Sequence, residues 1–295
     1  MKKSRRCATA VLTLPLLLLS GCLFTTRRLP VPKAPTIMQT VTPEELVQRL
    51  NQRWDALDTL YTTVEIQARA LKTKEGVEKD YTTFPGIIMM RKPELLRVYG
   101  RVPVIGSRMF DMVSDGKNFT LYIPSKDMAY EGPNSLNKRS PNAIENMRPG
   151  FFFDAMVVRG LEPDDEYAVT ADTDTIEDIK KKHLILIPEY VLNIVRAKPG
   201  TRELTPVRVV TFHRDDLLPY EQDLYDSNGN METQVTYANY RNFGTEQYPT
   251  TVVIKRPLEE YQIVLTVEKV VPNMKLSDDQ FQIKLPDDTK IQHLH

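Results

Sequence analysis

The chain has 295 residues, and its 39 basic and 39 acidic side chains balance to a formal net charge of zero at pH 7. This balance lacks the basic excess of nucleic-acid-binding domains, so nucleic acid is not an expected partner. The length is enough for one large β domain or two smaller domains, each with its own hydrophobic core.

The N-terminal residues predict a secretion signal. Residues 2–6 are mostly basic, and residues 8–19 are uncharged but fewer than the roughly 20 apolar residues that a membrane-spanning helix needs. Leu19-Ser20-Gly21-Cys22 follows and resembles the bacterial lipobox, in which the cysteine is acylated and becomes the first residue of the mature chain. We therefore expect residues 1–21 to be a signal peptide. An ordinary secreted protein and an uncleaved N-terminal helix are the alternatives.

Cys22 is then the expected site of a covalent lipid, and no other cofactor is expected. Removal of the signal peptide removes Cys7, the other cysteine, so no disulfide bond within the mature chain is expected. The closely spaced Pro30, Pro32 and Pro35 predict an extended tether over residues 22–41. Residues 42–295 would then form a single domain.

A helix is predicted at the start of this domain. Thr42-Pro43-Glu44-Glu45 has the pattern of a capping box with proline at the first helical position. Leu46, Leu50, Trp54 and Leu57 fall on one helical face, which would pack against the rest of the domain.

Alternation of apolar and polar residues predicts antiparallel strands through most of the domain. In the first half the predicted strands are 64–70, 81–91, 95–99, 109–114, 118–123 and 128–131. The pair Asp115-Gly116 indicates a hairpin turn, because these residues readily adopt the positive φ angles of a tight β-turn. In the second half the predicted strands are 167–171, 183–187, 190–196, 207–213, 218–225, 232–240, 251–255, 261–270 and 281–285.

The residues between these two halves predict a different structure. Residues 141–158 include Phe151-Phe152-Phe153 and read as helical segments that are broken at Pro149-Gly150. The acidic residues 164–166 and 172–174 are expected in solvated loops. The whole pattern predicts a mainly β (α+β) fold, a curved antiparallel sheet or half-open β barrel with helical insertions.

Five motifs occur in a characteristic order along the chain. They are Gly86, Arg91-Lys92-Pro93-Glu94-Leu95-Leu96-Arg97, Ser114-Asp115-Gly116-Lys117, Tyr122-Ile123-Pro124 and the C-terminal residues 276–286. In this order they resemble the LolA/LolB-like envelope lipoprotein carriers. The resemblance covers about residues 42–131 and the last twenty residues, whereas residues 167–248 match only in being rich in strands.

The resemblance implies a half-open barrel whose concave apolar face is covered by helices and accepts the acyl chains of a client. It implies a lipoprotein of the cell envelope that faces the periplasm from the outer membrane, because Leu23 and not Asp follows Cys22. The expected partners are the membrane, through the lipid anchor, and lipid or lipoprotein acyl chains. The alternative is a sensor or assembly factor that binds an envelope protein, which the longer middle region favours.

Nine apolar residues are predicted to form the ligand cavity and its lid. The cavity residues are Ile88, Met90, Leu96, Val98, Phe110 and Met112, and the lid residues are Phe152, Phe153 and Met156. Such a pocket needs no directional contacts, because burial of an acyl chain contributes about 0.8 kcal/mol per methylene. The alternative interpretation of each residue is ordinary core.

Two further segments are candidates by the same resemblance. Val102, Val104 and Ile105 lie in a loop that inserts into the membrane in anchored relatives; the alternative is a loop folded back onto the core. In the soluble carriers an arginine before the proline contacts the helical lid. Here that position is Lys92, with Arg91 before it, and lysine cannot make a bidentate contact, so we expect a looser or different lid contact.

No catalytic or metal site is predicted. His183, His213, His293 and His295 lack the spacing of metal ligands. The sequence contains no phosphate-binding loop, nucleophile elbow or Ser/His/Asp order. Asp111 and Asp115 lie beside a turn, where turn geometry explains them. We therefore expect a protein that is not an enzyme.

Overall fold

The computed structural model describes residues 38–72, 77–134, 149–178, 183–244 and 246–294. The predicted signal peptide, Cys22, most of the tether and the predicted helical residues 141–148 lie outside this part of the chain. Two compact units are present: Thr36–Thr173 with Pro188–His295 form the larger, and Asp174–Ile187 belong to the smaller. All described helices and apolar clusters lie in the larger unit, so the chain from residue 38 onward carries its own core.

Helix α1 (Pro43–Asp55) begins with the predicted capping box. The backbone N–H of Glu45 donates to the Thr42 hydroxyl at 3.2 Å, and the N–H of Thr42 donates to the Glu45 carboxylate at 2.9 Å. Leu46, Val47 and Leu50 are the buried face of this helix. The helix ends at Asp55, before Leu57, which packs against the core from the following turn.

The described strands form one sheet of fifteen strands. Their bounds are β1 (Thr59–Lys72), β2 (Val77–Asp80), β3 (Phe84–Arg91), β4 (Leu95–Arg101), β5 (Arg108–Ser114), β6 (Asn118–Ile123), β7 (Met128–Pro133), β8 (Asp165–Asp178), β9 (His183–Ala197), β10 (Leu204–His213), β11 (Pro219–Tyr225), β12 (Met231–Phe243), β13 (Glu246–Arg256), β14 (Tyr261–Pro272) and β15 (Lys290–His293). Two short 3-10 helices, η2 (Pro124–Lys126) and η3 (Asp278–Phe281), lie between strands.

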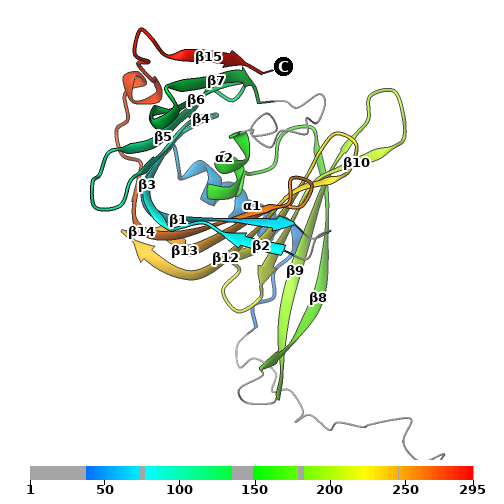
Figure 1. The fold of residues 1–295 in the computed structure, drawn as a ribbon. Coiled ribbons are helices and arrows are strands. Elements are labelled where there is room, and N and C mark those ends of the chain that lie inside the picture. The colour runs from blue at the N-terminus through cyan, green and yellow to red at the C-terminus, as the bar shows by residue number, and fades with distance from the viewer. Residues whose placement is uncertain (1–37, 73–76, 135–148, 179–182, 245, 295) are drawn as a thin grey trace, which may run out of the picture. The chain divides into compact units, whose positions relative to one another are not determined.

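The strand order is β15-β7-β6-β5-β4-β3-β1-β14-β13-β12-β11-β10-β9-β8, with β2 paired to β1 alone. The pairs whose register is resolved are antiparallel except β15 with β7. Irregularities in the ladders, such as the shift between Gly100 and Arg101, bend the strands. Within the larger unit the sheet curves around α1 and α2 without closing (Figure 1), which confirms the predicted half-open barrel with helices on its concave side.

Helix α2 (Gly150–Met156) lies inside this curve, and its Phe151, Phe152 and Phe153 join the largest apolar cluster. Helix α1 packs with β9 and β10 in a second cluster. A third, smaller cluster on the outer face of β3 and β4 is covered by Leu276 and Phe281 from the C-terminal segment. The sheet therefore buries apolar side chains mainly on its concave face.

Several predicted boundaries were wrong. Residues 81–83 precede β3, and residues 281–285 are not a strand: Ser277 and Gln280 form a capping box that starts η3, and the last strand is β15. The predicted break between residues 187 and 190 is absent, since β9 is continuous. Pro188 fits there because pairing with β10 begins only at Glu189.

The acidic residues 165–166 and 172–174 lie in β8 and not in loops. The prediction was wrong because alternation of apolar and polar residues identifies only strands that have one buried face. β8 ends the strand order, and most of its described side chains are exposed, so its backbone pairing needs no apolar face.

Candidate functional site

The predicted cavity residues come together on the concave face of β3, β4 and β5. Ile88 pairs with Val98, Met90 pairs with Leu96, and Val98 pairs with Met112 across neighbouring strands. All five side chains are at most 2% exposed. Because cross-strand partners point to the same side of a sheet, they form one apolar surface, as the alternation in the sequence predicts.

Helix α2 occupies the space in front of this surface. The predicted lid residues Phe152, Phe153 and Met156 are buried in the same cluster as the cavity residues, and Phe110 packs at its margin. Gly100 permits that packing, since a Cβ there would lie 2.7 Å from the Phe110 ring and 2.8 Å from the Phe84 ring. The structure therefore differs from an open apolar hollow: the consecutive phenylalanines of α2 fill the volume that a ligand would take.

The apolar space that remains between the helices and the sheet is small. About 70 Å³ is enclosed by residues of α1, the end of α2 and strands β12 to β14, with Met156 and Leu50 among the lining side chains. A second void of about 10 Å³ touches Met90 and Phe153. Neither space holds an acyl chain unless α2 moves. Whether the nine residues bind a ligand stays a prediction.

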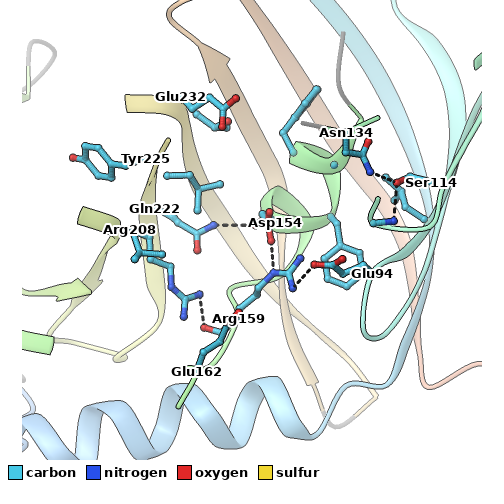
Figure 2. Close-up of a pocket in the computed structure, with 18 of the residues that line it drawn as sticks. Glu94, Ser114, Asn134, Asp154, Arg159, Glu162, Arg208, Gln222, Tyr225 and Glu232 are labelled. Atoms are coloured by element: carbon cyan, nitrogen blue, oxygen red, sulfur yellow. Dashed lines mark hydrogen bonds and ion pairs between the residues drawn. The ribbon is translucent and has the colours of Figure 1, made fainter. Parts of the chain in front are cut away.

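A larger cavity of about 440 Å³ lies on the flank of α2 and is rich in charged groups (Figure 2). Of the predicted residues only Leu96 and Phe153 line it. The charged lining residues are Glu94, Asp154, Arg159, Glu162, Asp165, Arg196, Arg208, Glu232 and Arg256. Sequence reasoning missed this site, because its charged partners come from distant segments and have no shared motif.

Arg159 joins α2 to the sheet beside this cavity. Its Nε donates to Asp154 of α2, and its guanidinium lies 3.4 Å from the Glu94 carboxylate in the turn before β4. The guanidinium carbon also lies 4.8 Å from the centre of the Phe153 ring. Burial by itself would lower the pKa of Arg159, but the charge and hydrogen bond of Asp154 raise it above the ordinary arginine value. This cation therefore connects α2, through Asp154, with the turn before β4, through Glu94.

Arg208 on β10 is a deeply buried cation of the cavity. It is 4% exposed, and it donates to the backbone carbonyls of Arg159, at 2.7 Å, and Gly160. Burial lowers the pKa of Arg208, and the nearby charge of Asp165 opposes part of this lowering. The carbonyl contacts hold the chain that leaves α2 against β10.

The remaining arginines of the cavity are paired with carboxylates. Arg196 lies 2.6 Å from Asp165, and Arg256 lies 3.2 Å from both Glu232 and Glu259. Arg256 also faces the Phe151 ring at 5.2 Å from its centre. Polar groups thus line the cavity while α2 presents aromatic rings to it, so the space suits the polar part of an amphiphile.

Arg91 and Lys92, the residues of the predicted lid contact, bind two elements other than α2. The Lys92 ammonium donates to the backbone carbonyl of Trp54 at the end of α1 and lies 4.1 Å from the centre of the Trp54 ring. Arg91 instead contacts the C-terminal segment, with hydrogen bonds to the Leu276 carbonyl, at 3.0 Å, and to Asp278. Lysine at this position therefore contacts a helix through a cation–π interaction and a carbonyl, without a bidentate fork.

The loop between β4 and β5 is exposed at its tip. The relative exposure of Val104 is 107% and that of Ile105 is 77%, whereas Val102 is half-buried. The alternative of a loop folded onto the core is therefore wrong. Contact of this loop with a membrane stays a prediction.

Among the described residues no group of three or more His, Cys, Asp or Glu side chains is placed to hold a metal ion. None of the described helices is both long and apolar enough to cross a membrane.

No protein-family model and no curated protein matches the sequence. Solved structures do resemble the fold. A LolA superfamily protein from Nitrosomonas europaea superposes with a TM-score of 0.50 at 16% identity, over 83% of this chain and 99% of its own. A DUF1329 family protein from Desulfovibrio piger has a TM-score of 0.49 at 14% identity, over 81% of this chain and 95% of its own. The first similarity shows a LolA-like fold, which confirms the fold that the sequence motifs implied.

Proposed function

We propose that this chain is a bacterial envelope lipoprotein that is anchored through Cys22 and takes up acyl chains of a lipid or lipoprotein between α2 and the concave face of the sheet. The observation that supports the proposal is the burial of α2 against the sheet. Helix α2 is a seven-residue helix without a side-chain N-cap, and five of its residues are buried in the apolar cluster that includes the concave face of β3, β4 and β5. Displacement of α2 would expose an apolar surface with the chemistry that acyl chains need.

The energies involved favour ligands with more than one acyl chain. Exposure of the four largest apolar side chains of α2 costs roughly 6–12 kcal/mol, at about 1.5–3 kcal/mol each. Burial of one sixteen-carbon chain contributes roughly 11 kcal/mol, at about 0.8 kcal/mol per methylene. One chain therefore about offsets the displacement of α2, and two or three chains exceed it.

The polar cavity beside α2 supports the same function. An acyl chain under α2 has its polar end where the aromatic rings of Phe151 and Phe153 meet the charged groups of Figure 2. Ion pairs such as Arg196 with Asp165 make that end of the groove polar. The proposal includes membrane contact through Val104 and Ile105, and it assigns no enzymatic step.

The only tryptophan of the chain reports the movement of α2. The Trp54 ring lies edge-on to Phe153, with 6.4 Å between ring centres. We expect a diacylated or triacylated lipopeptide, added to the chain that begins at residue 38, to change Trp54 fluorescence and to raise the melting temperature. The delipidated peptide is the matched control. If lipopeptide and control behave alike in both measurements, the proposed function is wrong.

A second candidate function is that of an assembly factor or sensor that binds an envelope protein. The edge strand β8 favours it, because residues 166–168 and 170–173 are exposed and a further strand could pair there. A pull-down that recovers one stoichiometric protein, at the same yield with and without lipopeptide, would favour this function over acyl-chain uptake.

A further inference from the structure

The loop of residues 102–107, between β4 and β5, is closed by its own backbone. The Val102 N–H donates to the Ser107 carbonyl at 2.8 Å, and the Gly106 N–H donates to the Val102 carbonyl at 2.9 Å. Val104 at the tip has a φ of 69°, a left-handed conformation that a β-branched residue rarely adopts. Strain of this kind persists where the surrounding structure imposes it, and here it holds an apolar side chain in water.

Three arginines surround a single tyrosine ring at the base of this loop. The guanidinium carbons of Arg97, Arg101 and Arg108 lie 5.7, 5.6 and 4.7 Å from the centre of the Tyr99 ring. Arg101 ends β4, Arg108 begins β5, and the two are partners across the hairpin. Like charges that face each other across a hairpin destabilise it, so this pair is a cost to the fold.

The positive charge of this cluster is only partly compensated. Asp111 is the carboxylate that pairs with the cluster in the described part of the chain; Arg97 contacts it through two hydrogen bonds of 2.9 and 2.6 Å, and Arg108 also reaches it. Burial, followed by the charges of Arg97 and Arg101, lowers the pKa of Arg108. Three cations and one anion leave a surplus of two positive charges beside the exposed tip.

We propose that Arg101 and Arg108, together with Val104 and Ile105, form a docking site for a bilayer that carries anionic phospholipids. The apolar tip enters the interface, and the guanidinium groups at its base meet lipid phosphates, to which arginine donates in a bidentate geometry. Both arginines are accessible to lipid phosphates, since the Arg108 side chain is 46% exposed and Arg101 is exposed. This proposal deepens the membrane contact in the proposed function but does not depend on acyl-chain uptake.

Vesicle flotation tests the docking site. The chain that begins at residue 38 lacks the predicted anchor and keeps all described elements, and circular dichroism verifies its fold. We expect it to float with vesicles of phosphatidylcholine and phosphatidylglycerol, and much less with phosphatidylcholine alone. Because each arginine near an anionic surface strengthens partitioning by about fivefold, the double variant Arg101→Gln/Arg108→Gln should bind roughly 30-fold more weakly. Higher salt should weaken binding in the same way.

Two further variants separate charge from apolar insertion. Val104→Ser/Ile105→Ser should reduce binding to both kinds of vesicle, because it removes the inserted side chains. Arg241→Gln/Lys269→Gln, on β12 and β14, removes two exposed cations outside the cluster and should leave binding unchanged. Equal binding to neutral and anionic vesicles overturns the proposal. An equal loss of vesicle binding in Arg241→Gln/Lys269→Gln and in Arg101→Gln/Arg108→Gln would also overturn it. Self-association through the tip, in place of vesicle binding, would do the same.

The outcomes also separate this proposal from the proposed function. Lipopeptide uptake, measured by Trp54 fluorescence in the absence of vesicles, should be the same in the arginine variant and in the unaltered chain. If uptake fails and anionic vesicles still bind, acyl-chain binding is wrong and the docking site stands. If uptake occurs and vesicle charge has no effect, the docking site is wrong and the carrier function stands.

Discussion

Buried charged side chains in this protein are held by specific partners. Asp111 has a side-chain exposure of 1% and lies between Arg97 and Arg108 on the outer face of the sheet. A buried carboxylate is costly unless it is paired, and removal of one member of such a pair leaves the other charge without compensation. Compensation of the charges of Arg97 and Arg108 therefore depends on Asp111.

We expect Asp111→Ala to reduce the free energy of unfolding by roughly 3–5 kcal/mol, because Arg97 is left buried without its partner. Urea unfolding, followed by circular dichroism, measures the change. Glu203→Gln is the control, since it removes an exposed pair with Lys198 and should cost under about 1 kcal/mol. If the two variants lose equal stability, the buried pair does not hold this part of the sheet.

Asp223 on β11 is a half-buried carboxylate, and it accepts a hydrogen bond from Gln234 at 3.2 Å. Burial raises its pKa above the ordinary value, an effect that the hydrogen bond and the charge of Lys255 only partly oppose. A pKa that is higher in the folded state means that the folded state binds the proton more tightly. The stability that this residue contributes is therefore present below the unfolded-state pKa and is lost as the pH rises through the folded-state pKa.

Asp223→Asn should therefore raise the melting temperature at pH 7 and change it little at pH 3, where the aspartic acid is already protonated. Asparagine keeps an acceptor for Gln234, so the main change is the loss of the half-buried charge. Thermal unfolding of both proteins at the two pH values measures the effect. A larger gain at pH 3 than at pH 7 would contradict the burial of this carboxylate.

At the level of secondary-structure elements, α2 has two opposing effects. It supplies apolar contacts that the concave face needs, and it occupies the groove that a ligand would enter. Its residues pack on the sheet, and its backbone carbonyls accept hydrogen bonds at Asp154, from Gln222 at 2.9 Å, and at Met156, from the Tyr248 hydroxyl. Arg159, which follows α2, adds an ion pair with Glu94. We expect a helix of seven residues with few such contacts to separate more easily than the central strands, which share ladders on both sides.

Phe152→Ala should lower the free energy of unfolding by roughly 3–5 kcal/mol and should also tighten lipopeptide binding, because less apolar contact is lost when α2 leaves the groove. Urea unfolding and a Trp54 fluorescence titration measure the two effects. Ile88→Ala, on the opposing wall, should lower stability and weaken binding together. If Phe152→Ala also weakens binding, the phenylalanine belongs to the ligand site and does not cover it.

At the scale of the whole molecule, the predicted anchor and the folded part are separate features. Every described element lies after residue 37, so we expect loss of the proposed lipid on Cys22 to change location and not folding. The resemblance to a solved LolA superfamily protein concerns the fold alone.

Cys22→Ala should leave the protein soluble or retained as an unprocessed precursor. Fractionation of cells, followed by a carbonate wash of the membranes, distinguishes the lipidated from the unlipidated chain. The melting temperature of the folded part should be unchanged in the variant. If the processed variant still remains with washed membranes, a lipid on Cys22 is not what holds the protein there.

The sequence by itself determined the elements whose signals are local. The capping box at Thr42, the alternation that places Ile88 and Met90 on one face, and the turn at Asp115-Gly116 all depend on neighbouring residues, and the structure confirms them. Gly116 indeed has a φ of 90°, the positive value that this turn needs. Local periodicity thus predicted the curved sheet.

Only the tertiary structure decided what occupies the concave face. The filling of the hollow by Phe152 and Phe153, and the ion pairs that Arg159 makes with Asp154 and Glu94, join segments that are far apart or unrelated in pattern. The sequence predicted only residues 167–171 of β8, because the exposed residues on either side of them show no periodic burial. Packing volume and charge pairing depend on distances in space, which no local pattern of residue types encodes.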